Sequence, residues 1–246
     1  MNETDMTGMR LGFVLFENEE FDWQGFVDNL QNDWDITAQK DEEKNVLVFE
    51  YDDMMVACGF MPGAVANNEA VENAKNNFFW PEAVEQTQKH KTHLVLSVMR
   101  GEDKIEQSLI YTMVASCALK LEGALGIYQW PTVLPPDYYV EMAQMINDDE
   151  LPIMDWIYFG LYPDEDGFSG YTIGLDFFGK KEVEIIKSKN KPEDIYNFLI
   201  NISTYIIEED VELLDGETIG FSQEQKLPVS HSKGVAVAGE SIKIAF

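Results

Sequence analysis

The sequence is poor in the side chains that recognise phosphate and metals. Its 246 residues include only two arginines, Arg10 and Arg100, and three histidines. Phosphate and nucleic-acid recognition depend on cationic side chains, and arginine is favoured because its planar group forms two parallel hydrogen bonds. Acidic residues outnumber basic ones by 45 to 17, which gives a net charge of −28. This composition excludes direct binding to nucleic acids and adhesion to an anionic membrane.

Cysteines and long apolar runs are scarce as well. Cys58 and Cys117 each lie inside an apolar stretch, where a thiol behaves as a small hydrophobic group, so neither a disulfide framework nor a zinc site is predicted. No apolar run approaches the roughly 18 residues that cross a bilayer. The first ten residues, MNETDMTGMR, lack the basic and apolar regions of a signal peptide. We therefore expect a cytoplasmic protein without a metal or a cofactor.

The usual signals of catalysis are missing. His90 and His93 have the spacing of a metal-binding pair, but no third ligand accompanies them, and an exposed turn is the preferred interpretation. There is no GxSxG motif, dinucleotide fingerprint or Walker loop. The segment PDEDG at 163–167 lacks the ligand spacing of a calcium loop. No catalytic residue is assigned, although a carboxylate-based activity would be hidden among so many acids.

Hydrophobic periodicity predicts the elements of the first part of the chain. Asp22 is expected to cap a helix whose apolar residues recur at helical spacing. Residues 36–39 (ITAQ) are expected to form a short strand. A hairpin is predicted from strands at 46–51 and 54–61, and the second strand is expected to be buried on both faces because it is apolar throughout.

The complete order of predicted elements points to an α+β fold with mixed or antiparallel sheets and helices packed on them. Two hairpin-then-helix stretches, 46–89 and 154–208, indicate two similar α/β subdomains, although no repeat of residues accompanies them. The boundary is placed near 148–152, which divides the chain into subdomains 1–150 and 151–246. The remaining predicted elements are strands at 10–17, 92–99, 124–130, 154–162, 170–179 and 182–188, helices at 81–89, 103–121 and 137–146, a helix starting at Pro192, and short strands near the C-terminus.

Several segments stand out together, in this order along the chain: NNEAVENAKNNFFWPEAVEQTQKHKTHLVLSV, LPIMDWIYFGLY, GYTIGLDFFGKKEVEII, and DGETIGFSQEQKLPVSHSKGVAVAG with SIKI. They resemble a bacterial family catalogued as domain of unknown function family 4261. The resemblance extends from Gly12 to Ile244 and implies a standalone cytosolic bacterial protein. It brings no activity, cofactor or catalytic residue with it, and it leaves open an association with toxin–immunity or secretion-linked gene clusters.

Two segments are candidates for binding a ligand or a partner. The first contains Asn73, Asn77, Trp80 and Glu82; amides can pair donors and acceptors with a ligand, but asparagines also cap helices and satisfy loop backbone. The second contains Asp215 and Glu217, whose carboxylates either belong to an acidic docking face or stabilise a turn.

The favoured hypothesis is a non-enzymatic interaction module that binds a basic protein through an acidic face, in an immunity-like or secretion-accessory role. Residues 1–60 hold 15 acidic and three basic side chains, so this segment is the first place to expect that face. The alternative is an enzyme or small-ligand-binding protein with a polar pocket near NNEAVENAKNNFFWPEA. A third hypothesis is a homotypic interface formed by exposed aromatic residues.

Overall fold

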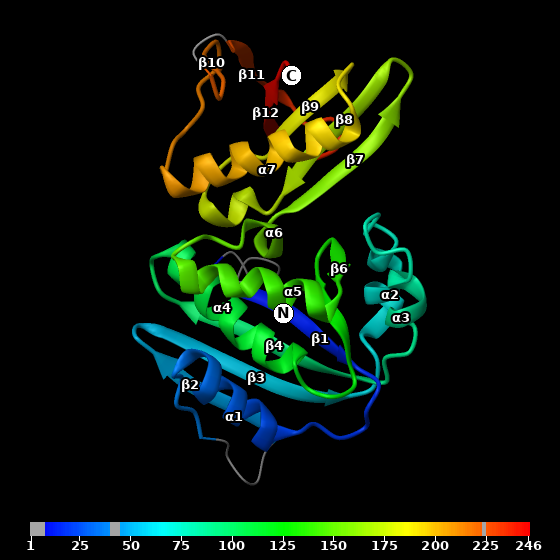
Figure 1. Cartoon of the computed structure of the whole chain (residues 1–246), viewed down its shortest axis with the longest axis vertical. Helices are drawn as coiled ribbons and strands as arrows, with labels where there is room; N and C mark the ends of the chain where they lie inside the picture. Colours follow the sequence, from blue (N-terminus) through cyan, green and yellow to red (C-terminus); the bar gives the residue numbers. More distant parts are fainter. Residues whose placement is uncertain (1–7, 40–44, 223–224) are drawn as a thin grey trace. The chain divides into compact units, whose positions relative to one another are not determined.

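The structure is a computed structural model that describes residues 8–39, 45–222 and 225–246 (Figure 1). Most of the segment MNETDMTGMR, and also Lys40 and Lys44, lie outside the described residues. Contacts divide the chain into two compact units, unit 1 (Met1–Asp155) and unit 2 (Trp156–Phe246). Each unit is built around its own sheet.

Unit 1 contains an antiparallel sheet in which the described residues form six strands. In spatial order the strands are β2 (Val46–Tyr51), β3 (Met54–Pro62), β4 (Thr92–Arg100), β1 (Arg10–Phe16), β5 (Ala124–Gln129) and β6 (Thr132–Leu134). The hairpin of β2 and β3 is the one that the sequence predicts. Since β2 and β6 are the edges, the long central strands β4 and β1 are paired on both sides.

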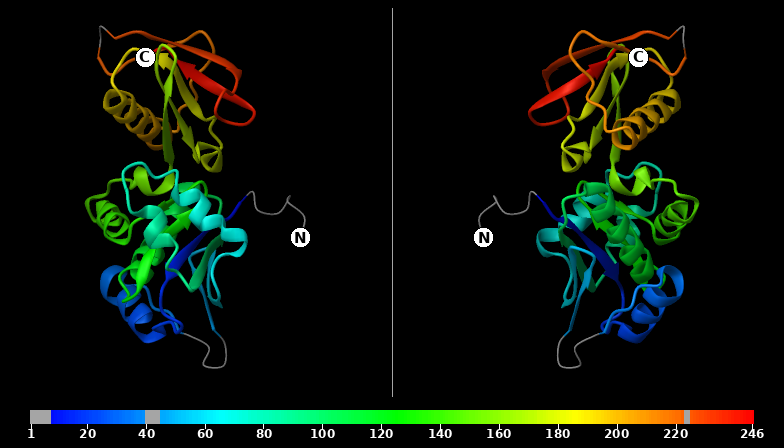
Figure 2. Two further views of the ribbon diagram at one scale, coloured as in Figure 1. Left: turned by 90° about the vertical axis from the view of Figure 1, so that its right-hand side faces the viewer. Right: turned by 90° about the vertical axis from the view of Figure 1, so that its left-hand side faces the viewer.

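One face of this sheet is covered along its whole width by the helices α1 (Trp23–Trp34), α4 (Lys104–Leu119) and α5 (Pro136–Ala143) (Figure 2). Asp22 and Asp103 cap α1 and α4 by accepting backbone N–H groups of the first turn, as predicted for Asp22. The covered face and its helices form a continuous apolar core that includes Phe26, Leu30 and Ile110.

The opposite face of the same sheet is covered at one end only. There the short elements η2 (Ala66–Asn68), α2 (Glu69–Ala74) and α3 (Ala83–Thr87) pack over β1, β5 and β6 in a second, smaller apolar cluster. This cluster contains Leu15 and Tyr128 from the strands and Ala70 and Ala83 from the helical segments. No residue of β2, β3 or β4 belongs to this cluster among the described residues.

Unit 2 contains a sheet with one parallel pair, β12 with β9. Its strands, in spatial order, are β10 (Thr218–Ile219), β11 (Leu227–Lys233), β12 (Glu240–Ile244), β9 (Val183–Ser188), β8 (Gly167–Ile173) and β7 (Tyr158–Asp164). The helix α7 (Pro192–Glu208) packs against β7, β8 and β9 (Figure 1). The other short helical segments are η3 (Gln144–Asp148) in unit 1, α6 (Ile153–Trp156) at the boundary between the units, and η4 (Leu175–Phe178) in unit 2.

The predicted α+β class is confirmed, and the two sheets differ in strand order and direction. The prediction of a strand at 36–39 is wrong. Asp35 has the left-handed conformation that ends α1, and the N–H of Ile36 donates to the carbonyl of Leu30 at 3.0 Å. The segment is thereby held against the end of the helix, where Ile36 and Ala38 enter the core without a strand partner.

Two further predictions are corrected. Residues 153–156 form a helical turn before β7, where the sequence indicated a strand from 154, and residues 175–178 form the 3-10 turn η4 after β8. The strand β3 is buried on one face only, because its residues alternate between buried and partly exposed. The partly exposed residues of β3 lie on the sheet face opposite the helices α1, α4 and α5.

Candidate functional site

Within the described residues of unit 1, the smaller apolar cluster does not extend over β2, β3 and β4, and most of the side chains that face outward from these strands are apolar. Cross-strand register brings outward-facing side chains together in rows, with Val46 opposite Gly59 and Gly59 opposite Val95, and with Val48 opposite Ala57. In the third row Met55 lies between Glu50 and Met99. The second row continues from Ala57 to Ser97, which is buried. We call this surface the open face, defined by Val46, Val48, Met55, Ala57, Gly59, Met61, Val95 and Met99.

The open face presents large aliphatic side chains to solvent. The exposed fraction is 51% for Val48, 45% for Met61 and 37% for Val46. Strands lie about 4.8 Å apart and rise about 3.3 Å per residue, so three strands over six residues cover roughly 15 by 20 Å. This footprint lies at the lower end of the range for the largest apolar patch of a monomeric protein, and such patches are often functional. Its methionines can adjust their shape to a partner.

Carboxylates border the open face. Glu50 follows Val48 on the outer side of β2, and the turn to β3 carries Asp52 and Asp53, all three exposed. The guanidinium of Arg100 lies 3.9 Å from the carboxylate of Glu50 at the surface, where such pairs contribute little to stability. An apolar centre with an acidic border is complementary to a partner with an apolar centre and basic surroundings.

The predicted Asn-rich segment lies over the other end of the same sheet face, where its amides form internal bonds. The amide of Asn73 donates to the hydroxyl of Tyr128 at 3.2 Å, and that of Asn77 donates to the carbonyl of Val133 at 2.9 Å. The side-chain oxygen of Asn77 also accepts the backbone N–H groups of Phe79 and Trp80. These amides fasten the segment to β5 and β6.

Trp80 and Glu82 follow these asparagines closely in the chain and have different surroundings. Trp80 is partly buried and packs on the smaller apolar cluster, while Glu82 is exposed at the start of α3. The hydroxyl of Tyr128 donates to the carboxylate of Glu69 at 2.6 Å. Burial and this hydrogen bond raise the pKa of Tyr128 above its ordinary value. This arrangement stabilises the fold of the segment, and its role in ligand binding stays a prediction.

Asp215 and Glu217 lie in unit 2 and hold the turn before β10. The carboxylate of Asp215 accepts the backbone N–H of His231 at 2.8 Å, and that of Glu217 accepts the N–H of Leu214 at 3.0 Å. Both residues are exposed. The structure therefore gives their carboxylates a turn-stabilising contact, which was one of the two interpretations of the sequence.

The two histidines of the HxxH pair do not form an exposed turn. His90 is buried, and its Nε2 accepts the N–H of Val65 at 3.0 Å. His93 lies in β4 with Nδ1 3.0 Å from the carbonyl of Gly63, and burial lowers its pKa. Among the described residues, no cluster of three or more His, Cys, Asp or Glu could hold a metal ion.

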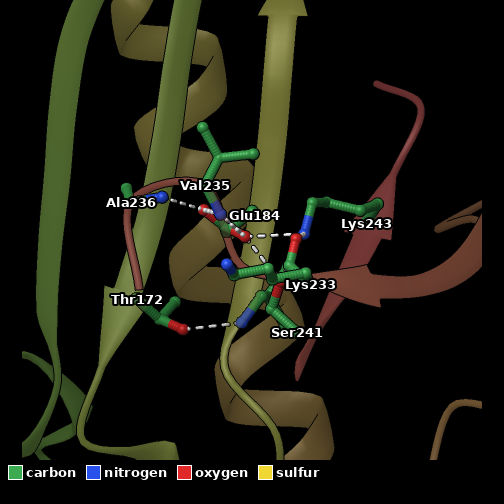
Figure 3. Close-up of polar contacts among 8 residues, drawn as sticks. Thr172, Glu184, Lys233, Val235, Ala236, Ser241 and Lys243 are labelled. Carbon is green, nitrogen blue, oxygen red and sulfur yellow. Dashed lines mark hydrogen bonds and ion pairs between the residues drawn. The ribbon is translucent and has the colours of Figure 1, made fainter. Parts of the chain in front are cut away.

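A buried carboxylate in unit 2 was not anticipated. Glu184, in β9, has an exposed fraction of 0% and lies beneath the loop that joins β11 to β12 (Figure 3). It accepts the backbone N–H of Ala236 at 2.7 Å, that of Val235 at 3.1 Å, the ammonium of Lys243 at 2.7 Å and the hydroxyl of Ser241. The carboxylate thus joins β9, β12 and the loop at a single point.

The hydrogen bonds determine the protonation state of Glu184. Burial alone would raise the pKa of this carboxyl, but the hydrogen bonds from Lys243, Ser241 and the loop backbone outweigh it, so the pKa is lowered. Ser241 and Lys243, next to two backbone N–H groups, superficially have the composition of a nucleophile–base site. Ser241 is fully buried, so a substrate cannot reach its hydroxyl, and the cluster is a structural tie.

The fold and these surfaces define an acidic α+β protein with two sheet-based units. Residues 171–245 match the family described as Domain of unknown function (DUF4261). The match confirms the resemblance for this part of the chain, which includes the whole Glu184 cluster, whereas the sequence had indicated nearly the whole chain. No curated protein and no solved structure matches. None of the helices in the described residues is long and apolar enough to cross a membrane.

Proposed function

We propose that this protein is a non-enzymatic interaction module that binds a basic protein on the open face of unit 1. The observation that supports this proposal is a largely apolar sheet face that no helix covers among the described residues of a strongly acidic unit. A folded sheet normally buries its apolar face against another layer, because each exposed aliphatic side chain forgoes about 1.5–3 kcal/mol of burial free energy. A partner that covers the open face would recover part of it.

Charge favours a basic partner over a second copy of the chain. Residues 1–155 hold 29 acidic and nine basic side chains, a net charge of −20. Two open faces placed together would bring two such units into contact, and like charges at an interface oppose association. A basic protein gains attraction from the same charges. An immunity-like or secretion-accessory protein that neutralises a basic effector is the concrete form of this function.

The size of the open face indicates the kind of complex. Its estimated area of about 300 Å² is smaller than the roughly 800 Å² that each partner buries in a stable complex. The open face would therefore be the apolar centre of the interface, and the surrounding carboxylates would form its polar border. Such an interface depends on both burial and charge, so its affinity should respond to both.

The test begins with capture of basic proteins from a bacterial lysate, followed by calorimetric titration of the purified candidate. The double variant Val48→Gln/Met61→Gln removes apolar contact at two exposed positions, and we expect it to weaken binding at least tenfold. Val235→Gln is the matched control, since Val235 is an exposed valine of unit 2 with a 64% exposed side chain. Added salt should weaken binding to the unmodified protein.

Lysozyme, as a basic protein without a fitted surface, measures non-specific attraction. We expect it to bind with the same affinity to the unmodified protein and to the double variant. The proposal fails if the captured candidate shows this same indifference, because its binding would then require only negative charge. It also fails if Val235→Gln weakens binding as much as the double variant does.

A further inference from the structure

Unit 2 contains a groove along α7 with a volume of about 440 Å³. Its volume lies within the range of small-molecule sites in proteins. Polar residues from the start and the exposed side of α7 form one wall, and residues near β10 and β11 and the last residue form the other. The lining residues are Asn190, Asp194, Asn197, Phe198, Asn201, Phe221, Gln225, Leu227 and Phe246.

Aromatic rings form the base of the groove. Phe198 is almost fully buried, and its ring stacks on that of Phe246 at a centroid distance of 4.3 Å. The ring of Phe221 meets Phe198 edge-on at 5.4 Å and keeps half of its surface exposed. Phe221 thus has a ring that packs against Phe198 and keeps apolar surface available to the groove, which suits the C–H face of a ring-shaped ligand.

Amides dominate the polar part of the lining. Asn197 and Asn201 are one turn apart on α7, and Asn190 precedes the helix. In the part of the chain that the structure describes, the side-chain amides of these three asparagines form no hydrogen bond, in contrast to those of Asn73 and Asn77. Each amide offers donors and an acceptor together, which matches hydroxyl groups that both donate and accept.

The charges of the lining narrow the ligand class. Among the described residues that line the groove, none is a lysine or an arginine, and Asp194 provides the one side-chain carboxylate. Phosphate and sulfate groups, which need cations or several converging N–H donors, are therefore disfavoured. We propose that this groove binds a neutral saccharide, with the amides contacting its hydroxyl groups and Phe221 contacting its ring face. This site is independent of the open face, since it lies in the other unit and takes another class of ligand.

The test is a nuclear magnetic resonance titration of the full chain with maltose, lactose and diacetylchitobiose, followed on the asparagine side-chain amides. We expect at least one sugar to shift the signals of Asn197 and Asn201 in a saturable way. An open groove with a few hydrogen bonds implies a dissociation constant of about 1 mM. Asn197→Ala and Asn201→Ala should each weaken binding about tenfold.

Matched controls come from exposed residues of unit 1. Asn147→Ala changes an exposed asparagine, and Phe79→Ala changes an exposed phenylalanine; both should leave the sugar affinity unchanged, whereas Phe221→Ala should weaken it. Spermidine tests whether Asp194 makes the groove a cation site. The proposal is overturned if no sugar shifts these signals, if spermidine alone does so, or if the unit 1 variants weaken binding equally.

Discussion

Residues 1–155 carry 29 acidic and nine basic side chains, whereas residues 156–246 carry 16 and eight. The two units also treat a buried carboxyl differently. In unit 2, Glu184 has donors on every side and a lowered pKa. In unit 1, the carboxyl oxygens of Asp155 find no hydrogen-bond donor within the described residues, and burial raises the pKa well above its ordinary value.

The two buried carboxyls show that the units use polar contacts in different ways. In unit 2, the carboxylate of Glu184 holds a loop through an ion pair and backbone donors. The contact between β9, β12 and this loop therefore depends on the charge of Glu184. Unit 1 depends on a large apolar core and leaves most of its acids on the surface, where they are available to a partner. Variants that change the buried carboxyls test whether this contrast is energetic as well as geometric.

The largest effect is expected for Glu184→Ala. The substitution removes the acceptor of two loop N–H groups and of the Lys243 ammonium, whose side chain is 16% exposed and also contacts the Lys233 carbonyl and the Ser241 hydroxyl. Removing one partner of a buried ion pair costs about 3–5 kcal/mol. Because Lys243 keeps other contacts, the free energy of unfolding measured by urea titration should fall by the lower end of this range. Glu240→Ala, which breaks an exposed pair with Lys181, serves as the control and should leave the urea midpoint unchanged.

Thiol labelling locates the loss. Both cysteines, Cys58 and Cys117, are buried in unit 1, and burial raises the pKa of Cys117 to about 12. Their labelling rate therefore reports the opening of unit 1. If Glu184→Ala speeds the labelling of the thiols in unit 1 as well as lowering the urea midpoint, the contacts of Glu184 do not stabilise unit 2 alone. The contrast between the units would then be wrong.

A smaller effect of opposite sign is expected for Asp155→Asn. A raised folded-state pKa means that the folded protein holds its proton more tightly than the unfolded chain does, so stability falls as pH rises above the ordinary value of 3.8. The amide removes this penalty, and the free energy of unfolding at pH 7 should rise by about 1–3 kcal/mol. Urea titration at several pH values would contradict this if the two proteins differed by the same amount at every pH.

The smallest effect concerns the pH response of unit 2. A lowered folded-state pKa gives Glu184 a stabilising contribution that is complete above its ordinary value of 4.5 and is lost as pH falls through the folded-state pKa. The difference in unfolding free energy between the unmodified protein and Glu184→Gln should be constant near neutrality and should narrow under acidic conditions. Glu182, whose pKa is raised by burial, is present in both proteins and cancels from the difference.

Much of the fold was predictable because its elements carry local signals. The helices α1, α4 and α7 have apolar residues at helical spacing, and a cap residue or a proline marks where each begins. The hairpin of β2 and β3 follows from two apolar runs around a short acidic turn. In contrast, β6 has only three residues, and residues 36–39 follow the helix end in a conformation that no strand pattern reveals.

The functional surfaces were less predictable for a physical reason. In β3 the outward residues Met55, Ala57 and Met61 are as apolar as the inward ones, so the alternation that reveals a one-sided strand is absent. The missing alternation predicted that β3 is buried on both faces, whereas its outward apolar residues belong to the open face. Glu184 and its donors are more than 50 residues apart, and the groove along α7 combines residues from 190–201, from 221–227 and Phe246. No local pattern connects such residues.

The place of β12 in its sheet has a consequence for biosynthesis. This strand is made after the other described strands of its sheet, yet it lies between β9 and β11. Lys243 follows Glu184 by 59 residues, and translation at 5–20 residues per second separates the two by roughly 3–12 s. During that interval the carboxylate of Glu184 lacks the ammonium of Lys243, and the sheet lacks the strand β12 that joins β9 to β11. Unit 1 can complete its core on the ribosome, whereas unit 2 must wait for residue 243 to emerge.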